Sequence, residues 1–203
     1  MDWWDFRGQN CALTALVVDI RNSTETFNSV ALETQADFLS EFTASLVAAL
    51  GDWVDRQARI VDFTGDGFFV LLRDEEDEGI QGPRRAVHIA RRMRDTFPAL
   101  RDSPEWTGSG LNVLGIGSGI AWGPVWYGAV SPSSPPPATG VGSSVVRAFR
   151  LSQHAKDGGI LVSRQTRHLL SPDITAAERP LNPELKGLED QFCFEIDPEE
   201  PSQ

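Results

Sequence analysis

Blocks of apolar and polar positions along the chain predict an α+β domain. The run 11–20 is apolar almost throughout, which is typical of a strand with both faces covered. Helical spacing of apolar residues over 24–50 and 80–97 predicts two long helices. Between them, 59–63 and 68–72 predict a hairpin, because the Asp-Gly pair in its turn is a strong hairpin signal.

The second half of the chain continues with strands and shorter helices. We expect strands at 111–121, 124–130, 159–163, 174–179 and 190–196, and helices at 141–156 and 164–171. The Pro/Ser-rich stretch 131–138 is interpreted as a stiff surface connection.

This order of elements predicts the split βαβ, or ferredoxin-like, plan. The first strand should lie in the middle of one sheet beside the hairpin, with the helices largely on one face. The 203 residues divide into an extension at 1–10, one domain at 11–196 and a flexible tail at 197–203.

Composition narrows the class of protein. Hydrophobic residues make up 40% and charged residues 23%, as in an ordinary globular domain. No apolar run approaches the roughly 18 residues that a membrane span needs, and the N-terminus lacks a basic leader, so we expect a cytoplasmic protein. A net charge of −11 argues against a nucleic-acid partner. Cys11 and Cys193 are interpreted as buried small hydrophobes.

Two aspartates carry the candidate chemistry. Asp19 ends the first strand and Asp66 lies in the hairpin turn, so the predicted topology brings both to one end of the sheet. Paired carboxylates can hold two hard cations against a polyphosphate. The residues after Asp19, Asn22-Ser23-Thr24, begin a predicted helix whose backbone N–H groups form an anion site. The three histidines fall at predicted helix positions away from these acids, which disfavours a phosphodiesterase or phosphatase.

The sequence resembles the class III nucleotide cyclases in five segments that occur in the same order. Together they span about residues 12–196, nearly the whole chain. The segments are Leu16-Val17-Val18-Asp19-Ile20 with Ser23-Thr24, Gly65-Asp66-Gly67-Phe68, Gly115-Ile116-Gly117-Ser118-Gly119, Gly142-Ser143-Ser144-Val145 through Arg150-Leu151, and Leu185-Lys186-Gly187-Leu188.

The resemblance implies a head-to-tail homodimer with two active sites at its interface. Asp19, Asp66 and the main-chain carbonyl of Ile20 would bind two Mg²⁺ or Mn²⁺ ions. Arg150 from the other subunit would stabilise charge on the α-phosphoryl group, and Lys186 would reach the terminal phosphates. The reaction would be attack of the ribose 3′-hydroxyl on the α-phosphorus with loss of pyrophosphate.

Three positions depart from the usual family pattern. Asp62 replaces the lysine with which adenylate cyclases read adenine N1; an acceptor cannot donate there, which disfavours ATP. Thr139 occupies the second base-reading position. Val146 replaces the asparagine that normally stands four residues before Arg150 and helps to orient the substrate.

A short cyclase domain without the purine-reading residues looks like the pyrimidine cyclases of bacterial Pycsar antiphage systems. That resemblance favours UTP over CTP as substrate and implies a cyclic nucleotide read by a separate effector protein. A guanylate or adenylate cyclase is the alternative within the family. A degenerate cyclase fold that binds a nucleotide without turnover is the alternative from another class.

Overall fold

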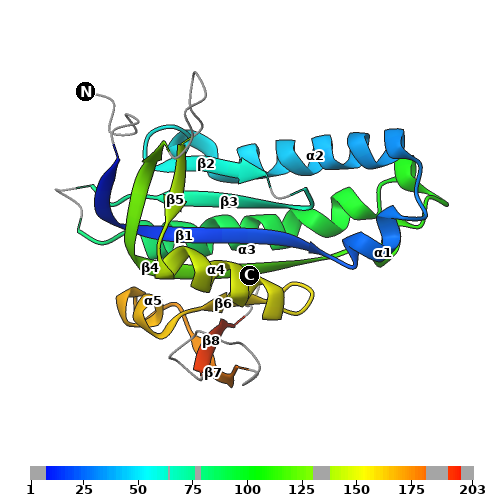
Figure 1. Cartoon of the computed structure of the whole chain (residues 1–203). Helices are drawn as coiled ribbons and strands as arrows, with labels where there is room; N and C mark the ends of the chain where they lie inside the picture. Colours follow the sequence, from blue (N-terminus) through cyan, green and yellow to red (C-terminus); the bar gives the residue numbers. More distant parts are fainter. Residues whose placement is uncertain (1–7, 64, 76–78, 130–137, 182–191, 198–203) are drawn as a thin grey trace.

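The computed structural model describes residues 8–63, 65–75, 79–129, 138–181 and 192–197, and they build one mixed sheet with helices on both sides (Figure 1). The strand order is β2-β3-β1-β4-β6-β8-β7, and β5 pairs with β4 outside this path. The strands are β1 Gln9–Arg21, β2 Ala58–Phe63, β3 Gly67–Leu72, β4 Gly115–Ala129, β5 Ala138–Val141, β6 Ile160–Val162, β7 Ala176–Pro180 and β8 Phe192–Ile196.

Strand β1 lies at the centre of the sheet, as the sequence predicts. It pairs antiparallel with β3, where Leu16 faces Val70, and antiparallel with β4 along its whole length. Successive side chains of β1 alternate between the two faces. Leu16 and Val18 enter the larger core, and Leu13 and Val17 enter a separate core on the other side. The continuous apolar run of β1 therefore reflects burial on both faces.

Helices α2 (Leu32–Leu50) and α3 (Gly82–Arg101) cover the face with the larger core, and α3 lies behind the sheet in Figure 1. Aromatic side chains join the two helices to each other and to the sheet. The ring of Phe42 lies 5.7 Å from that of Phe97 and 4.5 Å from that of Phe68 on β3. Burial of such large apolar groups is the main favourable term in folding.

Helix α4 (Ser143–His154) covers the opposite face, so the prediction of helices largely on one face is wrong for this helix. The reason lies in the glycines of β4. A Cβ atom on Gly119 would stand only 2.1 Å from the Ala148 carbonyl oxygen and 2.3 Å from the Ser152 nitrogen. The missing side chain lets the helix backbone rest directly on the strand.

The predicted helix 24–50 is broken into α1 (Ser23–Phe27) and α2. Between them the chain leaves the helical path, and the Gln35 side-chain amide donates to the carbonyls of Phe27 (2.6 Å) and Val30 (2.7 Å). These bonds satisfy backbone acceptors that a continuous helix would have used. The apolar residues of 24–50 therefore belong to a five-residue helix and a separate 19-residue helix.

The predicted strands 111–121 and 124–130 are also different in the structure. Residues Leu111–Val113 form a 3-10 turn after Gly110, whose φ of 86° a residue with a side chain rarely adopts. The chain then runs as the single strand β4, and β5 returns along it, which the sequence did not predict. In Figure 1, β5 crosses in front of β1 and β3. Most of the Pro/Ser stretch 131–138 lies outside the described residues.

The remaining helix is α5 (Arg164–Leu169), which agrees with the predicted short helix. Cys193 is buried in β8 as expected, whereas Cys11 in β1 is only half-buried; both are free thiols. Within the described part of the chain, no helix is long and apolar enough to cross a membrane.

Candidate active site

The two aspartates lie side by side at one end of the sheet. Asp19 is opposite Gly67 in the β1–β3 ladder, so Asp66 is one residue beyond its partner. The backbone N–H of Ile20 donates to the Asp66 carbonyl over 2.9 Å and fixes the turn against the end of β1. Antiparallel partners have Cα atoms about 5 Å apart, which places both carboxylates within reach of one group of cations.

The Asp19 carboxylate is partly enclosed, with 24% of its side chain exposed. Burial raises its pKa from 3.8 to about 6; the positive charge of Arg21 acts against this rise, and the negative charge of Asp66 adds to it. Two negative charges this close repel each other. A cation placed between them relieves both the desolvation and the repulsion.

Asp66 accepts a hydrogen bond at Oδ2 from the hydroxyl of Ser23, the first residue of α1. Ser23 is buried and Thr24 is exposed. The hydroxyl of Ser23 therefore orients the second aspartate and does not cap its own helix, since α1 has no side-chain cap.

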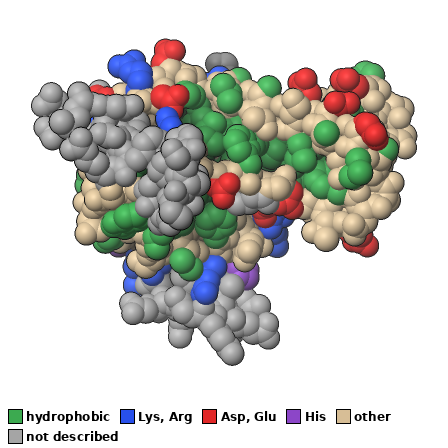
Figure 2. Space-filling view, turned by 45° about the horizontal axis from the view of Figure 1, so that its top comes forward, with side chains coloured by type: hydrophobic (Ala, Val, Ile, Leu, Met, Phe, Trp, Pro, Cys, Tyr) green, Lys and Arg blue, Asp and Glu red, His purple; other side chains and the backbone are tan. Residues whose placement is uncertain are grey.

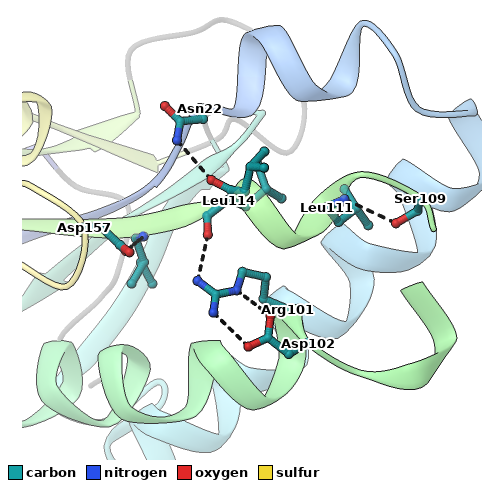
Figure 3. Close-up of polar contacts among 9 residues, drawn as sticks. Asn22, Arg101, Asp102, Ser109, Leu111, Leu114 and Asp157 are labelled. Carbon is teal, nitrogen blue, oxygen red and sulfur yellow. Dashed lines mark hydrogen bonds and ion pairs between the residues drawn. The ribbon is translucent and has the colours of Figure 1, made fainter. Parts of the chain in front are cut away.

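Asn22 makes the turn between β1 and α1. Its φ of 62° and ψ of 13° place it in the left-handed region, which asparagine tolerates better than most residues. Its side-chain amide donates to the Val113 carbonyl over 3.0 Å, from the 3-10 turn that precedes β4 (Figure 3). Arg101 donates to the neighbouring Leu114 carbonyl over 3.2 Å and anchors that turn to α3.

Of the two positions expected to read the base, one lies beside an aromatic residue on the α4 side of the sheet. A bulge in β2 places Asp62 opposite Phe69, and Asp62 is exposed. Thr139 lies in β5, where the next residue, Gly140, sits so close to the sheet that a Cβ atom would meet the Phe69 ring at 3.4 Å. Because side chains alternate along a strand, Thr139 points away from the ring that Gly140 faces, so only Asp62 lies beside Phe69.

Two phenylalanines close to the candidate base-reading positions lie on opposite faces of the sheet. The ring of Phe149 on α4 packs on Phe69, with ring centroids 5.4 Å apart. Phe63 belongs to the opposite face, where its ring packs edge-on against Phe68 and lines a cavity of about 260 Å³ with Leu39 of α2. Only Phe149 is therefore on the face that carries Asp19.

Arg150 lies on α4 and is partly buried. The helix begins beside Pro124, whose carbonyl accepts from the Ser144 hydroxyl over 2.9 Å. Ala155, immediately after the helix, lies against Gly117, which pairs with Asp19. Hence α4 runs toward the aspartates and ends next to them. Lys186 lies outside the described residues.

Val146 stands one helical turn before Arg150 and is 48% exposed; Val141, just before the helix, is exposed as well. In the space-filling view, hydrophobic side chains gather across the middle of the surface and carboxylates border them (Figure 2). An exposed apolar area beside charged groups is typical of an interaction site.

The residues at the two aspartates fit a pair of hard cations. Among the described residues there is no group of three or more His, Cys, Asp or Glu side chains that could hold a metal alone. Mg²⁺ is commonly bound through one or two carboxylates together with substrate phosphates and water. Two carboxylates and the nearby Ile20 carbonyl match this incomplete set, which a polyphosphate would complete.

Arg21 belongs to this site although the sequence reasoning did not assign it. Its guanidinium pairs with Asp19 and also donates to the Gln153 carbonyl of α4 over 3.2 Å. The sequence does contain a signal for this pairing. Arg21 is two residues after Asp19, and residues two apart on a strand have their side chains on the same face.

Comparison with known proteins identifies the fold. The solved structures that resemble it include the adenylyl cyclase CyaB from P. aeruginosa, with a TM-score of 0.83, 23% identity and coverage of 96% of this chain and 98% of that one. The guanylyl cyclase Cya2 has a TM-score of 0.79 and 23% identity, covering 93% of each chain. The guanylate cyclase domain of RhGC from Catenaria anguillulae, in complex with GTP, has a TM-score of 0.76 and 19% identity, covering 93% of this chain and 98% of that domain.

The chain therefore has the fold of a class III nucleotide cyclase catalytic domain, as its motifs suggest. No protein-family model matches the sequence, and no curated protein matches it.

Proposed function

We propose that this protein is a nucleotide cyclase that converts a nucleoside triphosphate to its 3′,5′-cyclic monophosphate and pyrophosphate. The observation that carries the proposal is the pair of electrostatically coupled carboxylates, Asp19 and Asp66, at adjoining strand ends of a cyclase fold. A purely structural acid at position 19 would gain little from a second carboxylate at this distance, because each raises the cost of ionising the other.

Each residue has a defined role in the proposed reaction. Two bound Mg²⁺ or Mn²⁺ ions would activate the 3′-hydroxyl and neutralise the departing pyrophosphate. Asp19 and Asp66 hold these ions, with the carbonyl of Ile20, and the Ser23 hydroxyl keeps Asp66 oriented. The residues that begin α1, Asn22, Ser23 and Thr24, lie next to the aspartates and receive the triphosphate.

The proposed active site is shared between two subunits in a head-to-tail homodimer. The exposed Val141 and Val146 lie at α4, on the face of the sheet that also carries Asp19, so a second copy can cover them. In this arrangement Arg150 of one subunit stabilises the transition state at the aspartates of the other, and Lys186 reaches the terminal phosphates. Preorganised charge of this kind is typically worth about 3 kcal/mol.

The base is proposed to be a pyrimidine, uracil before cytosine. Asp62 accepts hydrogen bonds and Thr139 can donate or accept, which suits an N–H donor next to a carbonyl or amine. Asp62 lies opposite Phe69, whose ring Phe149 also covers. A cyclic pyrimidine nucleotide would then act as a second messenger for a separate effector in antiphage defence, a role supported by the sequence resemblance alone.

A second candidate function is nucleotide binding without turnover. The specific observation in its favour is Val146, which presents a half-exposed apolar side chain where cyclases usually carry a substrate-orienting asparagine. The retention of Arg150 beside it favours the enzyme, because a binding module has no use for a group that acts on the transition state.

The test is to incubate the purified protein with Mn²⁺ and each of the four nucleoside triphosphates and to identify the products by mass. Asp66→Ala serves as the inactive control, and Asp52→Ala, in the 3-10 turn 51–53 after α2, as a matched control elsewhere on the surface. Cyclic UMP or cyclic CMP is the expected product. Cyclic GMP or cyclic AMP would overturn the base assignment only, whereas nucleotide binding without any product would favour the binding module.

A further inference from the structure

Arg21 joins the metal-binding end of β1 to the end of α4. Its Nη2 atom pairs with Oδ2 of Asp19, and its Nη1 atom donates to the Gln153 carbonyl over 3.2 Å. Gln153 lies in the last turn of α4, where carbonyl groups have no partner within the helix and attract cations. One guanidinium therefore contacts two elements that the proposed dimer assigns to different active sites.

The Arg21 side chain occupies space that a glycine on the neighbouring strand leaves open. It is 19% exposed, and its Nε atom lies 3.2 Å from where a Cβ atom of Gly117 would stand. The same absent Cβ would meet the Ala155 methyl group at 3.0 Å. Gly117 thus makes room for both the guanidinium and the end of α4, which brings the two into contact over the strand.

The hydrogen bonds of Arg21 are nevertheless incomplete. Its Nε–H is buried and has no acceptor among the described residues. A buried donor without a partner costs free energy, so this position of the side chain is held by the charge of Asp19 more than by a full set of bonds. Removing the negative charge of Asp19 would remove the main reason for Arg21 to stay.

We propose that Arg21 is a positioning residue that serves as the resident counter-cation of Asp19 and leaves it when a divalent cation takes the carboxylate. The proposal rests on the proposed function, in which Asp19 is a cation ligand. Arg21 and the cation compete for the same Oδ2 atom. Because Arg21 also bonds to α4, its release changes the contacts at the end of the helix that carries Arg150.

This arrangement links the two active sites of the proposed dimer. The aspartates of a subunit serve its own site, whereas Arg150 on the same subunit serves the site of the partner. When Arg21 moves from Asp19, the C-terminal turn of α4 loses a charged partner at Gln153. Loading of one site with cations thereby alters the helix that presents Arg150 to the other site, which is a physical coupling through one side chain.

The first test measures Mn²⁺ binding without nucleotide, by calorimetric titration at pH 8. In Arg21→Gln the competing charge is gone, so we expect Mn²⁺ to bind about tenfold more tightly than to the wild type. Arg21→Lys should stay within about threefold, because it keeps the charge. Arg59→Gln, which breaks an ion pair with Asp55 at the start of β2, should leave binding unchanged.

The second test follows amide hydrogen exchange at residues 151–157 with and without Mn²⁺. In the wild type we expect faster exchange when Mn²⁺ is bound, because Arg21 no longer holds the end of α4. In Arg21→Gln exchange should already be fast and should not respond to Mn²⁺. A merely structural role of Arg21 would change exchange equally in the presence and absence of the ion.

Three results would overturn the inference. If Arg21→Gln binds Mn²⁺ as the wild type does, or more weakly, Arg21 does not compete for Asp19. If exchange at the end of α4 does not respond to Mn²⁺ in the wild type, the link to α4 is wrong. If the wild type binds no Mn²⁺ at all, the two-cation site of the proposed function fails as well, and Asp19→Asn should then behave as the wild type does.

Discussion

The two faces of the sheet are built for different purposes. The face under α2 and α3 is filled with large apolar side chains, such as Phe38 and Phe42, which are fully buried and joined by edge-on aromatic contacts. The face under α4 has a smaller core, and beside it lie a charged cluster around Asp19 and exposed valines on and before the helix. The first face stabilises the fold, and the second carries the proposed active site at a cost in stability.

The largest expected effect is on the α2 and α3 face. Phe42→Ala should lower the free energy of unfolding by about 4 kcal/mol, because it empties a position that packs on both Phe68 and Phe97. Denaturant unfolding of the metal-free protein measures this loss. Val146→Ala, on the exposed side of α4, is the matched control and should cost less than about 0.5 kcal/mol.

The next effect is on activity and belongs to the α4 face. Arg150→Ala should lower kcat by about 100- to 1,000-fold, because in the proposed reaction this residue stabilises charge that develops in the transition state. Arg150→Lys should recover part of this loss, since it keeps the charge without the planar fork. Steady-state cyclase rates with Mn²⁺ measure both variants; a kcat close to that of the wild type in Arg150→Ala would remove Arg150 from the mechanism.

A third prediction uses the pKa of Asp19, which is raised to about 6 in the folded protein. Because the folded state binds this proton more tightly than the unfolded state, the contribution of Asp19 to stability is full below pH 4 and is lost as the pH rises through 6. Replacement by asparagine removes this loss. Relative to the wild type, Asp19→Asn should gain about 2 to 3 kcal/mol between pH 4 and pH 7.

Denaturant unfolding at a series of pH values, without divalent cations, gives this difference directly. A difference that does not change with pH would mean that Asp19 ionises as easily in the folded protein as in the unfolded chain. Val146→Ala, which removes no titratable group from the same face, is the control.

The smallest effect concerns the turn that separates the two aspartates from α1. Asn22→Val should cost about 1 to 2 kcal/mol, because a β-branched residue is strained at a φ of 62°. Asn22→Gly relieves the strain but loses the bond to the Val113 carbonyl, so its cost should be smaller. Equal stability of the two variants would show that the backbone conformation at Asn22 is not a constraint.

The sequence predicts much of this molecule because strand and hairpin signals are local. The run 11–20 and the Asp-Gly turn are sufficient to predict β1, the β2–β3 hairpin and the adjacency of Asp19 and Asp66. The position of α4 depends on something less local, the missing side chains of Gly117 and Gly119 on another strand. The break after Phe27 depends on side-chain bonds from Gln35. Neither feature changes the hydrophobic pattern.

The sequence also predicts only part of the candidate site. The predicted strand order is sufficient to bring the Asp19 and Asp66 carboxylates together. It does not predict which side chains bind to them. Ser23, expected only at the start of a phosphate-binding helix, orients Asp66 with its hydroxyl, and Arg21, which the motifs do not include, pairs with Asp19. Both contacts depend on how the end of β1 turns at Asn22, whose left-handed backbone no periodicity indicates.

The central claim is that the α4 face forms an active site shared by two subunits, and mixing two inactive variants tests it most directly. Asp66→Ala removes a cation ligand, and Arg150→Ala removes the charge supplied by the partner. Each alone should be nearly inactive. In an equal mixture that is allowed to exchange subunits, half of the dimers are mixed and each keeps one intact site, so about a quarter of the wild-type activity should return. A mixture as inactive as its components would contradict the account.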